Sequence, residues 1–330
     1  MKVILTGRDE HAGRGPDRAG RPPSRLLCRI ALGAAVVLLS ATACSGQPDP
    51  AAGTTRPLPS ATASGAPPGA EDVRSGFVAF GDFGTGGVAQ NAVARAMGSW
   101  ARTGHRVDAL VTTGDNVYPD GNPHLFAPRL DRPYRALPRP MWITLGNHDV
   151  QAGYGSAELR HLGLPNLPYA KQLPGIQLLF LDANHPDAAQ TRWLEDRLSA
   201  SGPPVRVVVF HQPAWSCSLH GSTPAVDSRW VPVLERHRVT LVLSGHDHNY
   251  QRFTSAHGVT YIVTGGGGAS LYPVASGCRT PHRAAAASRH HFTAVEATAT
   301  HVTVTAVGDD GGVLDRTVLP VPQPSRQPQP

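Results

Sequence analysis

The stretch LVLSGHDHNY (241–250) is the part of the sequence that decides the fold. An apolar run is followed by Gly245 and then by two histidines, His246 and His248, on either side of an aspartate. A short and almost continuous apolar run is typical of a strand that is buried on both faces. Polar residues directly behind such a strand lie where open α/β sheets bind their ligands. The stretch therefore indicates a buried strand that leads into a binding site.

The same pattern of an apolar run followed by polar residues occurs four more times. These stretches are FVAFGDFG (77–84), VDALVTTGDNVY (107–118), PMWITLGNHD (140–149) and VRVVVFHQPAW (205–215). Helical patterns lie between them at 90–102, 188–200 and 227–237, and the segments after residue 258 are mostly strands. This order predicts an α/β fold in which two sheets form a sandwich with helices outside. All five polar motifs then lie at the carboxyl ends of strands.

Each motif alone has a simpler explanation, because an aspartate or asparagine after a strand often caps a turn. Together the motifs supply only oxygen and imidazole groups. The candidate ligands are Asp82, Asp115, Tyr118, Asn147, His211, His246 and His248. Seven groups are too many for one tetrahedral site, but they suit two adjacent metal ions that share a carboxylate. Asp115 is the candidate for the shared group.

Tyr118 indicates which metals to expect. A phenol with a pKa of about 10 binds a metal readily only when a strong Lewis acid displaces its proton. The half of the site with Asp82, Asp115, Tyr118 and one histidine is anionic and suits Fe(III). The other half contains Asn147, two histidines and the shared Asp115, and it suits a divalent ion such as Fe, Zn or Mn.

The five motifs resemble those of the metallophosphoesterase (calcineurin-like) superfamily. Within it, Tyr118 and the absence of a histidine two residues after Asp82 resemble the purple acid phosphatases. The loop FHQPAWSCSLHGST (210–223) is most similar to that of their small, tartrate-resistant type 5 kind. The resemblance runs from about Phe77 to Leu319. It implies a four-layer αββα sandwich of two mixed sheets flanked by helices.

The resemblance also implies a role for each residue. Asp82, Asp115, Tyr118 and His248 would hold Fe(III), and Asp115, Asn147, His211 and His246 would hold the divalent ion. His148 would bind the phosphate oxygens, and His220 would protonate the leaving group. The implied activity is that of an acid phosphatase, which hydrolyses phosphate monoesters by attack of a metal-bound hydroxide.

Two other functions remain open. A phosphodiesterase or nucleotidase would use the same metal centre with a different rim, and a non-catalytic lipoprotein would only bind metal or phosphate. The segments 119–139, 150–170 and 269–291 follow no pattern of the family. The sequence therefore does not choose between a phosphorylated small molecule and a phosphoprotein as the substrate.

The N-terminal region is typical of an exported protein. Residues 1–44 form an Arg-rich segment followed by the apolar stretch IALGAAVVLLSATAC (30–44), which predicts a signal peptide. Cys44 predicts a lipoprotein on the cell surface or in the periplasm, attached to the membrane by a lipid, whereas cleavage without lipidation predicts a secreted protein. Residues 45–74 predict a disordered tether, 75–320 the metallophosphoesterase domain, and 321–330 a disordered tail.

Charge and cysteine content complete these expectations. The formal net charge is +6, and residues 1–44 hold seven lysines and arginines against three acidic residues. Most of the excess positive charge therefore belongs to the leader, so we expect no nucleic-acid partner. We also expect a monomer. Cys217 and Cys278 are the only cysteines after Cys44. We expect a disulfide between them, with two unpaired buried cysteines as the alternative.

Overall fold

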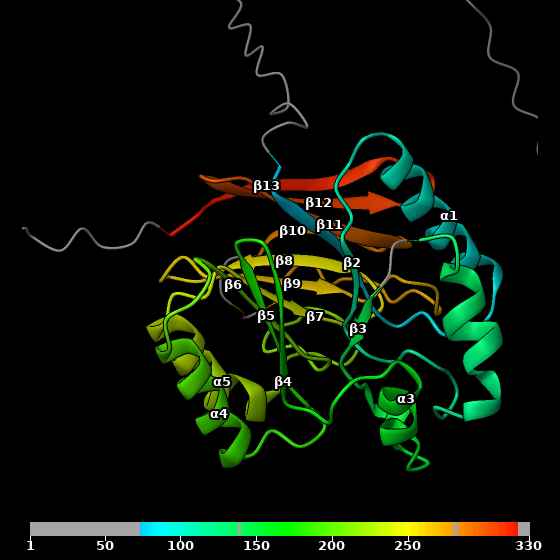
Figure 1. Cartoon of the computed structure of the whole chain (residues 1–330), viewed down its shortest axis with the longest axis horizontal. Coiled ribbons are helices and arrows are strands. Elements are labelled where there is room, and N and C mark those ends of the chain that lie inside the picture. Colours follow the sequence, from blue (N-terminus) through cyan, green and yellow to red (C-terminus); the bar gives the residue numbers. More distant parts are fainter. Residues whose placement is uncertain (1–72, 138–139, 279, 281–282, 323–330) are drawn as a thin grey trace, which may run out of the picture. The chain divides into compact units, whose positions relative to one another are not determined.

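The computed structural model describes residues 73–137, 140–278, 280 and 283–322. In these residues two β-sheets form the centre and helices flank them (Figure 1). The expected signal peptide with Cys44, nearly all of the tether and most of the tail lie outside the described residues. Within the described part, the chain contains no helix with the length and apolar character needed to cross a membrane.

The first sheet combines strands from both ends of the domain, in the order β13-β12-β11-β1-β2-β3. Its strands are β1 (Ser75–Phe80), β2 (Ala109–Thr112), β3 (Met141–Ile143), β11 (His291–Ala297), β12 (His301–Gly308) and β13 (Val313–Pro320). β1, β2 and β3 pair in parallel, whereas the pairs β1–β11, β11–β12 and β12–β13 are antiparallel. The sheet is therefore mixed.

The second sheet is formed by the middle of the chain, in the order β10-β8-β9-β7-β6-β5-β4. Its strands are β4 (Tyr169–Leu173), β5 (Ile176–Phe180), β6 (Val205–Val209), β7 (Leu241–Ser244), β8 (Tyr250–Thr254), β9 (Thr260–Thr264) and β10 (Arg283–Ala287). The pairs β5–β6, β6–β7 and β7–β9 are parallel, and β4, β8 and β10 pair antiparallel with their neighbours. The predicted fold of two mixed sheets flanked by helices is confirmed.

Three long helices occur where the sequence predicts helices. They are α1 (Val88–Arg102), α4 (Ala188–Ser199) and α5 (Pro224–Arg236). The shorter elements are η2 (Pro123–Leu125), η3 (Ala127–Asp131), η4 (Arg132–Tyr134), α2 (Asn147–Val150) and α3 (Gly155–His161). Figure 1 shows α4 and α5 on one flank of the sheets and α1 on another.

Side chains on the central strands of the second sheet alternate between two cores, which explains why these sequences are apolar throughout. On β6, Val207 and Val209 belong to the core between the sheets. Val208 belongs to the second core, together with Leu194 of α4 and Trp230 of α5. A strand with an apolar core on each face has no place for alternating polar residues, so polar side chains collect at its ends.

A buried polar contact joins the two sheets. Thr264 of β9 contacts two residues of β11 through its hydroxyl, with 3.1 Å to Nε2 of His291 and 2.9 Å to the hydroxyl of Thr293. Nδ1 of His291 lies 2.9 Å from the carbonyl oxygen of Arg289. His291 is 0% exposed. Burial, and to a lesser extent the neighbouring His290, lowers its pKa from 6.5 to about 4.

This histidine makes stability depend on pH. Because the pKa of His291 is lower in the folded chain than in the unfolded chain, its contribution is fully present above pH 6.5 and is lost as the pH falls toward 4. Between pH 7 and pH 5, His291 takes up a proton mainly in the unfolded chain. We expect this to reduce the free energy of unfolding by about 2 kcal/mol. In His291→Gln, chemical denaturation should show a correspondingly flatter pH dependence. The exposed His257→Gln is the control, and an unchanged slope in His291→Gln would contradict this account.

Candidate metal centre

The seven predicted ligands all follow strand ends, and they divide by sheet. The oxygen donors follow β1, β2 and β3 of the first sheet: Asp82, Asp115, Tyr118 and Asn147. The imidazoles follow β6 and β7 of the second sheet: His211, His246 and His248. The centre is therefore assembled where the carboxyl ends of strands from both sheets meet.

The backbone is strained at three of these ligands. The φ values are 57° at Asp82, 51° at Asp115 and 70° at His246. They lie in the left-handed region that residues other than glycine rarely occupy. Such conformations cost on the order of 1–3 kcal/mol each and persist where surrounding contacts hold them. Here the N–H of Asp82 donates to the carbonyl of Gly114 at 3.0 Å, and the N–H of His246 donates to the Asp82 carboxylate at 3.0 Å. These contacts hold the backbone of Asp82 and His246 in this conformation.

Four of the predicted ligands converge on one point, and we call them the Tyr118 cluster: Asp82, Asp115, Tyr118 and His248. The Tyr118 hydroxyl lies 3.1 Å from Oδ2 of Asp115 and 3.1 Å from Nε2 of His248. That Nε2 is 3.4 Å from Oδ1 of Asp82. The ligand atoms of Asp82, Asp115 and His248 all lie within 4.8 Å of one another. This is the group that the resemblance to the purple acid phosphatases assigns to the ferric ion.

A second group, the Asn147 cluster, contains Asp115, Asn147, His211 and His246. Nε2 of His211 lies 3.2 Å from Oδ1 of Asn147, 3.2 Å from Nδ1 of His246 and 3.4 Å from Oδ2 of Asp115. The Oδ2 atom of Asp115 therefore faces both clusters. The structure brings all seven predicted side chains together, and their assignment as metal ligands stays a prediction.

Main-chain carbonyls orient two of the imidazoles. Nδ1 of His248 lies 2.7 Å from the carbonyl oxygen of Ser270, and Nδ1 of His211 lies 2.8 Å from that of Thr113. A carbonyl oxygen only accepts hydrogen bonds, so each Nδ1 carries the proton. Nε2 then faces its cluster, where its lone pair can bind a metal ion once the ring has no proton on that atom.

Burial and charge act against each other at Asp115 and His211. Burial alone would lower the pKa of His211, but the carboxylates of Asp115 and Asp82 raise it to about 10. Burial alone would raise the pKa of Asp115, but His211 holds that pKa well below its ordinary value. Without a metal ion, the two residues form an imidazolium–carboxylate pair. A metal ion that binds both would replace the imidazole proton.

The surroundings shift the pKa values of Tyr118 and His246 in opposite directions. Burial, with the carboxylates of Asp82 and Asp115 beside it, raises the pKa of the Tyr118 hydroxyl far above its ordinary value. Only a strong Lewis acid would displace that proton. Burial and the neighbouring His211 lower the pKa of His246 to about 3, so its imidazole is neutral. A neutral imidazole is the form that binds metals.

This donor set fits two metal ions. Within the described residues, the ion pairs of Asp82 and Asp115 are formed with histidines, and no lysine or arginine neutralises these buried carboxylates. The facing nitrogens of His211 and His246 need a shared proton or a cation between them. Buried anions and facing imidazoles without a fixed cation are costly unless a metal compensates them.

Glycines in the motifs make room for the two carboxylates. A Cβ atom on Gly245 would lie 2.4 Å from Oδ2 of Asp82, and a Cβ atom on Gly146 would lie 2.0 Å from Oδ1 of Asp115. These distances exclude any side chain. The glycines before Asn147 and His246 are therefore part of the site, because they let the backbone of one loop approach the carboxylate of another.

The two histidines predicted to act in catalysis each lie beside a different cluster. The ring of His148 is 4.5 Å from that of Tyr118 between centroids, and its backbone N–H donates to Oδ1 of Asp115 at 2.9 Å. The exposed ring of His220 stacks on His246 with 4.1 Å between centroids. Both imidazoles border the centre, and their roles remain predictions.

Two buried aspartates that the sequence analysis does not select hold the ligand loops. The Asp149 carboxylate accepts the backbone N–H groups of Asn116, Val117 and Gly146 at 2.8–3.1 Å, which ties the loop after β2 to the loop after β3. The Asp247 carboxylate accepts the backbone N–H of His220 at 2.9 Å. The position of Asp149 as the last residue of GNHD was the available signal for it.

The three segments without a family pattern take different forms. Residues 119–139 contain η2, η3 and η4, residues 150–170 contain α3, and residues 269–291 contain β10. Cys217 and Cys278 form the predicted disulfide, with their Cα atoms 5.6 Å apart. This bond ties the loop of His220 to the segment 269–291.

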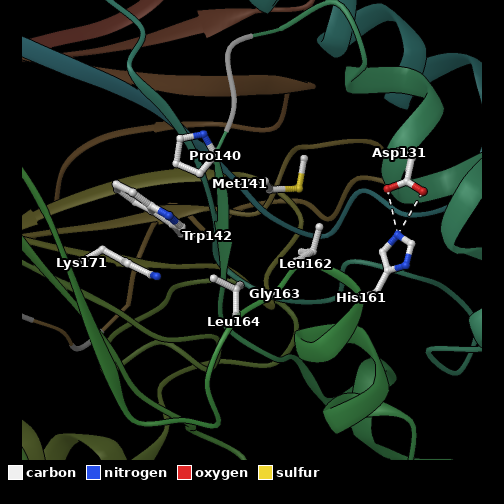
Figure 2. Close-up of a pocket in the computed structure, with 9 residues that line it drawn as sticks. All are labelled: Asp131, Pro140, Met141, Trp142, His161, Leu162, Gly163, Leu164 and Lys171. Carbon is white, nitrogen blue, oxygen red and sulfur yellow. Dashed lines mark hydrogen bonds and ion pairs between the residues drawn. The ribbon is translucent and has the colours of Figure 1, made fainter.

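A separate cavity of about 320 Å³ lies at the beginning of β3 (Figure 2). Its lining includes the apolar side chains of Met141 and Trp142, with Lys171 beside them. Figure 2 shows the ion pair of Asp131 and His161 on the other side, with 3.0 Å between Oδ1 and Nε2. None of the predicted site residues lines this cavity, and the GNHD motif follows the opposite end of β3.

Comparison with known proteins agrees with this geometry. Residues 76–250 match the calcineurin-like phosphoesterases. The chain belongs to this family. Human tartrate-resistant acid phosphatase type 5 is 27% identical to it over 293 residues, which cover 74% of this chain and 90% of the human protein. Purple acid phosphatase 4 of Arabidopsis thaliana is 27% identical over 238 residues, or 59% of this chain and 68% of the plant protein.

Solved structures share the fold of this calcineurin-like phosphoesterase. The purple acid phosphatase PPD1 from yellow lupin has a TM-score of 0.67 at 15% identity and covers 74% of this chain and 53% of that one. GAP50, the anchor in the inner membrane complex of Plasmodium, has a TM-score of 0.68 at 20% identity. The match covers 77% of this chain and 90% of the GAP50 chain. The predicted family is confirmed, and so is the predicted enzyme class, because the named relatives are acid phosphatases.

A side chain added at Gly245 should disrupt the metal centre. Gly245→Ala would push a methyl group against the Asp82 carboxylate, so we expect it to lower metal content and to reduce activity on the order of a hundredfold. Gly98→Ala in α1 is the matched control, because its Cβ would meet only the flexible end of Arg102 at 3.3 Å and Leu137 at an ordinary contact distance of 3.9 Å. Metal analysis and steady-state kinetics would check both variants. Full activity in Gly245→Ala would contradict the role of this glycine.

Proposed function

We propose that this calcineurin-like phosphoesterase is an exported acid phosphatase that hydrolyses phosphate monoesters with two metal ions. The observation that carries the proposal is the pair of ligand clusters that share Oδ2 of Asp115. Such a centre stabilises charge on a phosphoryl group from two sides. The acid phosphatase names of the relatives support the reaction class.

The proposed metals follow from the ligands. The Tyr118 cluster, with two carboxylates and a phenol, would hold Fe(III), and the Asn147 cluster, with two imidazoles and an amide, would hold divalent Fe, Zn or Mn. When bound, the two ions would supply Lewis acidity to the phosphoryl group and to the attacking water.

Two histidine side chains would bind the phosphate group and transfer the proton. His148, beside the Tyr118 cluster, would donate a hydrogen bond to a phosphate oxygen. His220, beside His246, would hold a proton on its imidazole and transfer it to the oxygen of the leaving group. The Asp247 carboxylate supports this role, because it fixes the backbone of His220.

The proposed location rests on the leader and the disulfide. The Arg-rich segment, the apolar stretch and Cys44 support export and attachment to a membrane by a lipid. The disulfide between Cys217 and Cys278 supports an oxidising compartment outside the cytoplasm. We further propose that the protein is a monomer without a nucleic-acid partner, with phosphorylated small molecules or phosphoproteins as substrates.

Metal analysis combined with hydrolysis tests the proposal. We expect about two metal ions per chain, and faster hydrolysis of p-nitrophenyl phosphate than of bis(p-nitrophenyl) phosphate. A protein with bound Fe(III) should be coloured, and Tyr118→Phe should lose the absorption band, whereas Tyr154→Phe should keep it. Faster diester hydrolysis would favour a phosphodiesterase, and metal-loaded protein without turnover would favour a binding protein. A colourless, iron-free and fully active enzyme would contradict the ferric site.

Cysteine variants of the leader test the location. In a bacterial host that processes lipoproteins, we expect the full chain in the membrane fraction and Cys44→Ser in a soluble exported fraction, because the variant lacks the residue that carries the lipid. Cys28→Ser, within the same leader, is the control and should stay in the membrane fraction. Unchanged membrane attachment of Cys44→Ser would contradict lipidation at this residue.

A further inference from the structure

Residues Ser270–Cys278, which we call the arm, are fastened to the loop of His220. The arm lies between β9 and β10. The contacts that join it to the loop are the disulfide between Cys278 and Cys217, the hydrogen bond from the N–H of Ala275 to the carbonyl of Cys217 at 2.8 Å, and the hydrogen bond from the hydroxyl of Ser218 to the carbonyl of Pro273 at 2.9 Å. Arm and loop therefore form one unit beside the metal centre.

Within the arm, Tyr272 is fixed against the metal centre. Its N–H donates to the carbonyl of His248 at 3.1 Å, and its carbonyl accepts from the side chains of Asn249 at 3.3 Å and Ser288 at 2.9 Å. The ring stacks on the imidazole of His248, with 4.1 Å between centroids and 13° between planes. Because hydrogen bonds hold its backbone and stacking holds its ring, the ring of Tyr272 has a fixed position.

The imidazole of His220 is held only by other rings. It stacks on His246 at 4.1 Å, and it meets the ring of Tyr272 at 5.4 Å and 67°. In the described part of the chain neither of its nitrogens has a hydrogen-bond partner, and the only fixed polar contact of this residue is from its backbone N–H to Asp247. The two aromatic contacts therefore determine the orientation of the exposed imidazole.

We propose that Tyr272 is a positioning residue for His220, an inference that rests on the proposed phosphatase function. His246 and Tyr272 form a corner that confines the imidazole while both of its nitrogens stay free for a substrate. Without the ring of Tyr272, the side chain of His220 would populate other rotamers and would spend less time in the orientation from which it reaches a leaving group.

A series of aryl phosphates with leaving groups of increasing pKa tests this role. A loss of proton transfer matters most for poor leaving groups. We expect Tyr272→Ala to lower kcat for the poorest leaving group by about threefold to tenfold, the effect of losing one aromatic contact, with little change for the best one. Tyr272→Phe keeps the ring and should resemble the wild type. Tyr272→Leu keeps part of the apolar volume without the ring and should resemble Tyr272→Ala, so the test remains possible if the alanine variant does not fold.

Controls separate positioning from structural damage. Val274→Ala alters the same arm without touching His220, and it should leave the series unchanged. In a His220→Ala background, Tyr272→Ala should add no further dependence on the leaving group. An equal loss for all substrates, a loss of metal, or an effect that persists without His220 would overturn the positioning role. If His220→Ala itself shows no dependence on the leaving group, the proposed function fails in its assignment of the general acid.

Discussion

The rest of the centre depends on the buried carboxylate of Asp115. Its Oδ1 accepts the backbone N–H of His148, and its Oδ2 faces both the Tyr118 hydroxyl and the imidazole of His211. The residue is 1% exposed, and an anion at such a depth is costly unless positive charge surrounds it. That charge comes from outside its own sheet, because His211 follows β6. The end of β2 and the end of β6 must therefore meet before the His211 imidazole can supply positive charge to this carboxylate.

The layers of the fold could be predicted because its central strands have apolar residues on both faces. Runs such as VRVVV and LVLS have no other stable place than between two cores. The edges could not be predicted in the same way. β10 reads RAAAA, and alanine has little preference for strands, so this strand exists because it pairs with β8. β5, next to the edge strand β4, reads IQLLF and is fully buried, and although Asp182 and Asn184 follow it, neither is among the predicted metal ligands that marked the other strands.

The ligands could be predicted for a related reason, since each follows a strand that the sequence reveals. Asp149 was missed although it lies in a motif, because its partners are backbone groups of two different loops. Tyr272 could not be found at all from the sequence. Its contacts with His248 and His220 join segments that are distant in the chain, and the disulfide to Cys217 brings them together. No local pattern encodes such a contact.

The division of the ligands between the sheets has a thermodynamic consequence. Oxygen donors from the first sheet and imidazoles from the second would bind the same ions, so bound metal would cross-link the sandwich. A chain whose sheets have separated offers neither ion its full set of ligands, and mass action then favours the docked state as the free metal concentration rises. The metal ions that serve the reaction would also hold the two sheets together. The concentration of metal around the cell would then affect the stability of the folded protein.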